Sequence, residues 1–102
     1  MKVYFSTRGK ERLDSVMKYL EDHWPKKMKI DFIDKLDKAI KVISKFPDSF
    51  PESKSQPGLF QCNITKHNTI YYQIRKNEVE IVTIFDNRQH PKRLKKEIRK
   101  KK

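Results

Sequence analysis

The sequence predicts an α+β fold, in which an N-terminal strand and an antiparallel helical hairpin pack on a mainly antiparallel, four-stranded curved sheet. Apolar residues recur at helical spacing in two stretches of the first half, and they alternate with polar residues in three short runs of the second half. The turn between the two helical stretches is so short that the helices must run antiparallel. The 102 residues suffice for one domain, 1–102, with a basic tail at 89–102.

The charge balance narrows the classes of partner. Lys and Arg number 25 against 13 Asp and Glu, and the net charge of +12 attracts phosphate groups or an acidic protein. No apolar run approaches the roughly 20 residues that cross a bilayer, and no secretory signal is visible, so we expect a cytoplasmic protein with no membrane partner. Cys62 is the only cysteine, which excludes an internal disulfide and a multi-cysteine zinc site. We expect no metal, no cofactor and no small-molecule substrate.

The first half begins with a strand at residues 2–5, which are β-branched and aromatic, and Ser6-Thr7 then supplies a helix cap. A helix over residues 8–23 follows, and its apolar face consists of Leu13, Val16, Met17, Leu20 and Trp24. Pro25 suits the first turn of a second helix, which ends before Pro47. The apolar stripe of this second helix consists of Phe32, Leu36, Ala39, Ile40 and Ile43.

The second half supplies the sheet that the helices cover. Alternation predicts strands at residues 60–64, 70–74 and 79–85. Tight turns at His67-Asn68 and Lys76-Asn77 join them, because these residues tolerate left-handed backbone conformations.

The last strand is apolar on both sides, which predicts a central place in the sheet. Strict alternation puts Val79, Ile81, Thr83 and Phe85 on one face, and Val82 and Ile84 on the other.

Two large aromatic side chains are candidates for binding a partner protein. Tyr71 and Tyr72 are adjacent on one strand and must point to opposite faces, so one packs in the core and Tyr71 is exposed or covered by a partner. Trp24 lies at the tip of the helical hairpin, where it either completes the apolar stripe or serves an interface.

Two segments lie outside this framework. Residues 47–58 hold three prolines and a glycine and form either an ordered spacer or a mobile loop. Residues 89–102 hold eight Lys or Arg and one Glu, so much of the basic charge is local. Within this tail Leu94 and Ile98 lie four residues apart and are placed to dock a short terminal helix.

The order of strand, two helices and three strands resembles the RelE/ParE superfamily, the toxins of bacterial type II toxin-antitoxin systems, also known as plasmid stabilisation proteins. Residues 70–74 and 79–88 look like the family's ending R-x-x-Y-x-I … I-x-I-x-x-x-x-x-R. Similar residues also sit at four other places, namely Phe5-Ser6, Phe32, Leu36 and Pro47. Together these positions cover nearly the whole chain.

The resemblance implies a growth-arresting toxin that a cognate antitoxin holds inactive. RelE-like members cut messenger RNA on the ribosome without a metal, whereas ParE-like members inhibit DNA gyrase. We therefore expect the ribosome with its mRNA, or gyrase, as the target. A non-catalytic nucleic-acid-binding module is the alternative, because a charge of +12 by itself gives salt-sensitive binding to a duplex.

A RelE-like activity would need a cation beside the scissile phosphate and groups that transfer protons. Arg88 matches the arginine that ends the family's last strand and is the candidate catalytic cation, with a surface pair to Asp86 as the alternative. His90 follows two residues later and is the candidate for proton transfer, with a solvated histidine as the alternative.

Other basic residues are candidates for contact with a nucleic acid or another target, namely Lys54, Lys66, His67, Lys92 and Arg93. For His67 a role in the turn, and for the lysines a solubilising role, are the alternatives. Two departures from the RelE-like pattern favour either ParE-like action or a nuclease whose cationic groups are rearranged. Thr69 stands near the place of an expected arginine, and no aromatic residue follows Phe85.

Overall fold

The structure is a computed structural model that describes residues 1–54 and 56–99. Its elements are, in chain order, β1 (Lys2–Phe5), α1 (Thr7–His23), α2 (Lys26–Lys45), β2 (Phe60–Asn63), β3 (Asn68–Arg75), β4 (Glu78–Asp86) and α3 (Pro91–Arg99). The predicted α+β class is confirmed, and so is the short helix in the basic tail. Residues 100–102 of that tail lie outside the described part of the chain.

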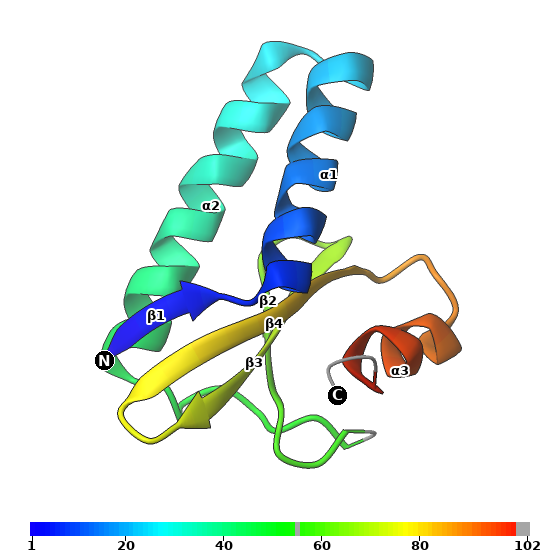
Figure 1. Ribbon diagram of the computed structural model, residues 1–102. Helices are drawn as coiled ribbons and strands as arrows, with labels where there is room; N and C mark the ends of the chain where they lie inside the picture. The colour runs from blue at the N-terminus through cyan, green and yellow to red at the C-terminus, as the bar shows by residue number, and fades with distance from the viewer. Residues whose placement is uncertain (55, 100–102) are drawn as a thin grey trace.

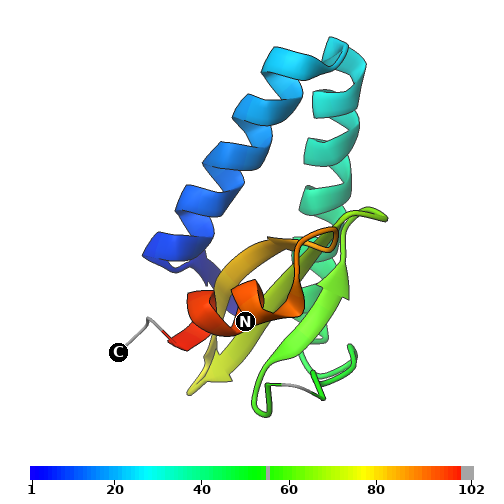
Figure 2. The same cartoon turned by 90° about the vertical axis from the view of Figure 1, so that its right-hand side faces the viewer.

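The four strands form one sheet in the order β1-β4-β3-β2, so the predicted central place of the last strand is confirmed. β2, β3 and β4 pair antiparallel, whereas β1 runs parallel to β4, which makes the sheet mixed. The helical hairpin covers one face of this sheet, and α3 covers the opposite face (Figures 1 and 2). No helix within residues 1–54 and 56–99 has the length and apolar character needed to cross a bilayer.

Each face of the sheet buries its own apolar cluster. The main cluster lies under the hairpin and consists of Phe32, Leu36, Ile43, Cys62, Ile64, Ile70, Tyr72, Val79, Ile81 and Ile84. The smaller cluster lies under α3 and consists of Leu59, Tyr71, Val82, Phe85 and Leu94, with Ile98 partly buried against it. The predicted docking of the tail through two apolar residues is therefore confirmed.

The predicted strict alternation of side chains along β4 is wrong for the second half of the strand. Tyr71 pairs with Thr83 while Tyr72 pairs with Ile81, so Val82 is an extra residue in a β-bulge. After the bulge the alternation changes phase. Ile81 faces the hairpin, whereas Thr83 faces α3, where its hydroxyl donates to Glu97. Strict alternation would have placed both residues on the same face.

The start of α1 lies unusually close to β4. The Ser6 side chain caps the helix by accepting a hydrogen bond from the Gly9 amide, at 2.9 Å, and its hydroxyl donates to the Val82 carbonyl, also at 2.9 Å. A Cβ atom at Gly9 would lie 2.6 Å from the carbonyl oxygen of Ile81. A glycine in the first turn of α1 is therefore what allows the helix to approach the central strand.

The described part of the segment between α2 and β2 is held against β2. The Ser53 amide donates to the Leu59 carbonyl at 2.7 Å, and the Gln61 amide donates to the Pro51 carbonyl at 2.9 Å. These bonds favour the ordered spacer over the mobile loop as the interpretation of this segment.

Candidate functional site

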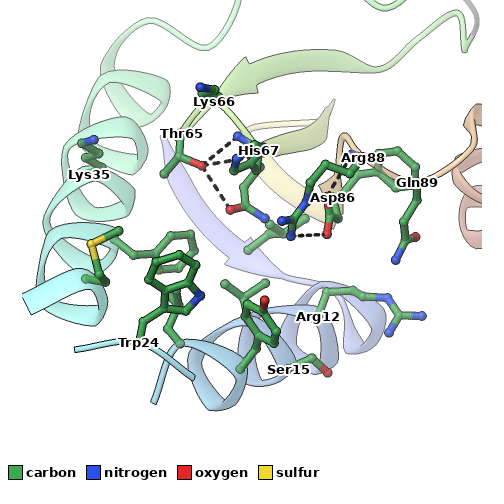
Figure 3. A pocket seen from close by; sticks show the side chains of 18 of the residues that line it. Arg12, Ser15, Trp24, Lys35, Thr65, Lys66, His67, Asp86, Arg88 and Gln89 are labelled. Atoms are coloured by element: carbon green, nitrogen blue, oxygen red, sulfur yellow. Dashed lines mark hydrogen bonds and ion pairs between the residues drawn. The ribbon is translucent and has the colours of Figure 1, made fainter. Parts of the chain in front are cut away.

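An open cleft of about 790 Å³ lies between the helical hairpin and the end of the sheet where β4 finishes (Figure 3). The hairpin extends beyond the sheet (Figure 1), so the apolar stripe near its tip has no strand to cover it. The apolar lining of the cleft includes Val16, Leu20, Trp24, Met28, Phe32 and Ile84. Trp24 is 48% exposed and Met28 is 41% exposed, so the tip offers apolar surface that a second molecule can cover.

The rim of the cleft is mainly basic. Its basic side chains are Arg12, Lys35, Lys66, His67, Arg88 and Arg93, and they outnumber the three carboxylates of the lining, Asp31, Asp86 and Glu97. Figure 3 shows Trp24 and Lys35 on the hairpin side and His67 and Arg88 on the side of the sheet. The cleft thus combines an apolar floor with a positive rim, which suits an amphipathic, acidic ligand.

Arg88, the candidate catalytic cation, is bound to Asp86 in the manner of the predicted surface pair. Its Nε donates to Oδ1 of Asp86 at 3.0 Å and its Nη2 to Oδ2 at 2.9 Å, and the Arg88 amide also donates to Oδ1 at 2.9 Å. The hydrogen bond from Arg88 holds the pKa of the Asp86 carboxyl below its usual value, and the same bond raises the pKa of Arg88. Both groups therefore stay ionised, and the carboxylate offsets the guanidinium charge within the cleft.

The turn between β2 and β3 carries Lys66 and His67 to the cleft. The hydroxyl oxygen of Thr65 accepts hydrogen bonds from the amides of His67, at 3.1 Å, and Asn68, at 3.2 Å. Neither His67 nor Asn68 has a positive φ, so the predicted left-handed turn is wrong here, because the Thr65 hydroxyl organises the turn instead. In the second turn Lys76 has φ 55°, as expected.

His90 lies outside the cleft lining and caps α3. Its Nδ1 accepts a hydrogen bond from the Lys92 amide at 3.1 Å, and its carbonyl accepts one from the Arg93 amide at 2.9 Å. The structure thus gives His90 a local structural task, and its role in proton transfer stays a prediction.

The remaining predicted site residues are dispersed. Lys54 is exposed in the segment before β2, and Lys92 is exposed on α3, so neither lines the cleft. Tyr71 is 8% exposed because α3 of the same chain covers it, and the expectation of an exposed Tyr71 is wrong. Of the two partner-binding candidates, only Trp24 is accessible.

Sequence reasoning missed several residues of the cleft. Tyr19 is 45% exposed, packs its ring against His23 with centroids 4.8 Å apart, and adds to the raised pKa of Arg88. Tyr19 falls three residues after Val16, so it borders the apolar stripe, which is the one signal in the sequence. Nothing local marks Arg12, whose Nε donates to Oε2 of Glu97 across the fold at 3.0 Å.

No cluster of three or more His, Cys, Asp or Glu suited to a metal ion occurs within residues 1–54 and 56–99.

Comparison with known proteins identifies the family. The family described as "ParE toxin of type II toxin-antitoxin system, parDE" matches residues 3–91. No curated protein matches the chain.

Solved structures share the fold at low sequence identity. The chromosomal ParDE toxin-antitoxin system from P. aeruginosa superposes with a TM-score of 0.72 at 10% identity, covering 84% of this chain and 95% of that chain. A YoeB/ParE toxin from Agrobacterium tumefaciens gives 0.62 at 12% identity, with 84% and 98% covered. The YoeB dimer from Staphylococcus aureus gives 0.59 at 16% identity, with 83% and 94% covered.

The family match extends from β1 to the first residue of α3 and so includes the hairpin, the sheet and the Arg88 motif. The chain therefore belongs to the ParE toxin family of type II toxin-antitoxin systems.

Proposed function

We propose that this toxin arrests growth by binding and inhibiting DNA gyrase, as ParE-like members of the superfamily do, and not by cutting RNA. The observation that carries the proposal is the Arg88–Asp86 pair. A phosphate that reached Arg88 would have to compete with a carboxylate that already takes two of the guanidinium bonds, and it would meet the negative charge of that carboxylate. Such an arrangement disfavours stabilisation of a phosphorane.

The RelE-like nuclease remains the second candidate, and one observation favours it. Lys66 and His67 line the same cleft as Arg88, so three groups that can bind or protonate a phosphate lie on the rim of one cleft.

Two assays on the purified protein separate these candidates. Under the gyrase proposal the protein blocks supercoiling of a relaxed plasmid and leaves mRNA on programmed ribosomes uncut. Under the nuclease candidate new 3′ ends appear on the ribosomal mRNA, and Arg88→Gln abolishes them. Lys41→Gln is the charge-matched control, because Lys41 is exposed on α2 and lies outside the cleft lining. Mapped cleavage that requires Arg88, with supercoiling unaffected, would overturn the proposal.

We further propose that the cleft is where an antitoxin neutralises the toxin. An acidic, amphipathic segment would cover the exposed apolar tip and pair with the basic rim. The solved YoeB-YefM complex from Staphylococcus aureus, whose toxin shares this fold at 15% identity, gives the proposal a precedent for a protein partner.

Trp24 is the only tryptophan of the chain, so its fluorescence reports on the cleft alone. Binding of the acidic segment encoded beside the toxin gene should shift the emission to shorter wavelength, and Met28→Asp should weaken binding at least tenfold. Ile30→Asp is the matched control, because Ile30 is exposed on α2 but is not part of the lining. Tight binding with unchanged Trp24 emission would place the antitoxin elsewhere.

A further inference from the structure

We propose that the outer face of α3 is a binding surface for the phosphodiester backbone of a nucleic acid. This basic face consists of Lys92, Lys95 and Lys96, which follow the i, i+3, i+4 spacing of residues on one side of a helix. All three side chains are exposed. The inference does not rest on gyrase inhibition or on RNA cleavage, and none of the three lysines lines the cleft.

The opposite side of α3 explains why this charge is uncompensated. Glu97 is the only acidic residue of the helix, and it points inward, where Oε2 accepts from Arg12 at 3.0 Å and Oε1 accepts from the Thr83 hydroxyl at 2.7 Å. Among the ion pairs formed within residues 1–54 and 56–99, none involves a lysine of the basic face. The helix therefore presents cations to solvent, and its single carboxylate attaches it to α1 and β4.

Some lysines of the helical hairpin, in contrast, are paired with carboxylates. Three of them form pairs with an aspartate one turn away, namely Lys18–Asp22 at 3.2 Å, Lys38–Asp34 at 3.1 Å and Lys41–Asp37 at 3.1 Å. Unlike these three hairpin lysines, the lysines of the basic face have no carboxylate partner within residues 1–54 and 56–99, so their charge remains available to a polyanion.

A nucleic acid fits this surface better than a membrane does. An amphipathic helix binds a bilayer by inserting its apolar side. The apolar side of α3 is not available for this, because Leu94 is buried, at 5% exposure, and Ile98 is packed against the smaller cluster. Binding of a phosphate backbone requires only accessible cations. Arg93 belongs to the same helix and lines the cleft, so a strand lying along α3 would pass beside the candidate site.

The test is fluorescence anisotropy of the purified full chain with a labelled single-stranded RNA and a labelled DNA duplex, over a series of salt concentrations. The triple variant Lys92→Gln, Lys95→Gln, Lys96→Gln should weaken binding on the order of tenfold or more, and the slope of log affinity against log salt should become shallower by about 2 to 3. The control, Lys18→Gln, Lys38→Gln, Lys41→Gln, removes the same charge from the hairpin and should change affinity by no more than about twofold. The triple arginine variant of the basic face should bind like the parent.

Weakening confined to the basic face, with either RNA or DNA, supports the proposal, and the two probes show which nucleic acid is preferred. Equal weakening by the control would mean that net charge alone drives binding, and it overturns the proposal. No binding of either probe by the parent, or binding only to phosphatidylserine vesicles, also overturns it. Circular dichroism melting of each variant confirms that the comparison is made between folded proteins.

Discussion

The two faces of the sheet are covered in different ways. The face under the hairpin buries side chains from α2 and from three strands, with further partly buried residues of β1 and α1 packed against them. The face under α3 buries a small cluster to which the helix contributes one buried side chain, Leu94, and a carboxylate tether, Glu97. Because apolar burial is the dominant stabilising term, the hairpin face should hold the fold together while α3 remains a lightly attached cover that presents charge.

The largest expected effect tests the hairpin face. Ile43 is completely buried, so Ile43→Ala should lower the free energy of unfolding by about 3 to 4 kcal/mol through lost burial and a residual cavity. Urea denaturation followed by circular dichroism measures the change. Val42→Ala, at a neighbouring position that is 42% exposed, is the control and should cost far less. A similar cost for both variants would contradict the assignment of the main core to this face.

The second test asks whether α3 unfolds by itself. Leu94→Ala should remove about 2 kcal/mol, mostly from the local stability of α3, since Leu94 is the main apolar contact of that helix. Hydrogen exchange should show faster amides in α3 and unchanged amides in α2. Uniformly faster exchange over the whole sheet would show instead that both faces belong to one cooperative unit.

Adjacent tyrosines sharpen the comparison, because they point to opposite faces. The Tyr72 hydroxyl donates to the Pro47 carbonyl, so Tyr72→Phe should cost about 1 kcal/mol at neutral pH. The Tyr71 hydroxyl has no hydrogen bond within residues 1–54 and 56–99, so Tyr71→Phe should be close to neutral by the same denaturation measurement.

The pH dependence of the Tyr72 effect has a defined sign. Burial raises the pKa of Tyr72 from 10.0 to about 12, so the folded state holds this proton more tightly than the unfolded state. Its contribution to stability is complete below pH 10 and is lost as the pH rises from 10 to about 12. Tyr72→Phe should therefore reduce the alkaline loss of stability. An alkaline profile that Tyr72→Phe leaves unchanged would contradict the buried, hydrogen-bonded phenol.

The smallest effect concerns the Asp86–Arg88 pair at the end of β4, which belongs to neither apolar cluster. Asp86→Asn should cost about 0.5 kcal/mol near pH 7, because Arg88 is largely exposed and water screens the pair. The lowered pKa of Asp86 means that this contribution is present above the usual carboxyl pKa and is lost as the pH falls below about 4. In thermal melts at a series of pH values, the melting temperature of Asp86→Asn should therefore fall less at acid pH than that of the parent. An equal fall in both proteins would contradict the pair.

Features set by short stretches of sequence were predictable. The apolar stripes of the two helices, the Ser6 cap and the alternation in β2 and β3 all follow from side-chain spacing within an element, and the structure agrees with them. The order of the elements and the motif that ends at Arg88 likewise predicted the family together, because both are properties of the linear chain, and the family match confirms it.

Features that depend on contacts between distant segments were not predictable. The bulge at Val82 changes the face of the residues that follow, and it is visible only in the pairing of β3 with β4. The burial of Tyr71 depends on where α3 docks, which lies far along the chain from the strand that carries Tyr71.

The sequence by itself determined the elements, their order, the basic charge and the family, since periodicity, composition and motif spacing are properties of the linear chain. The tertiary structure decided which charges act together. It joined residues from α1, α2, the β2–β3 turn and β4 in one cleft, and it turned Glu97 inward so that the lysines of α3 face solvent. The physical reason is that Coulomb interactions depend on distance and burial in space, which the positions of residues along the chain do not specify.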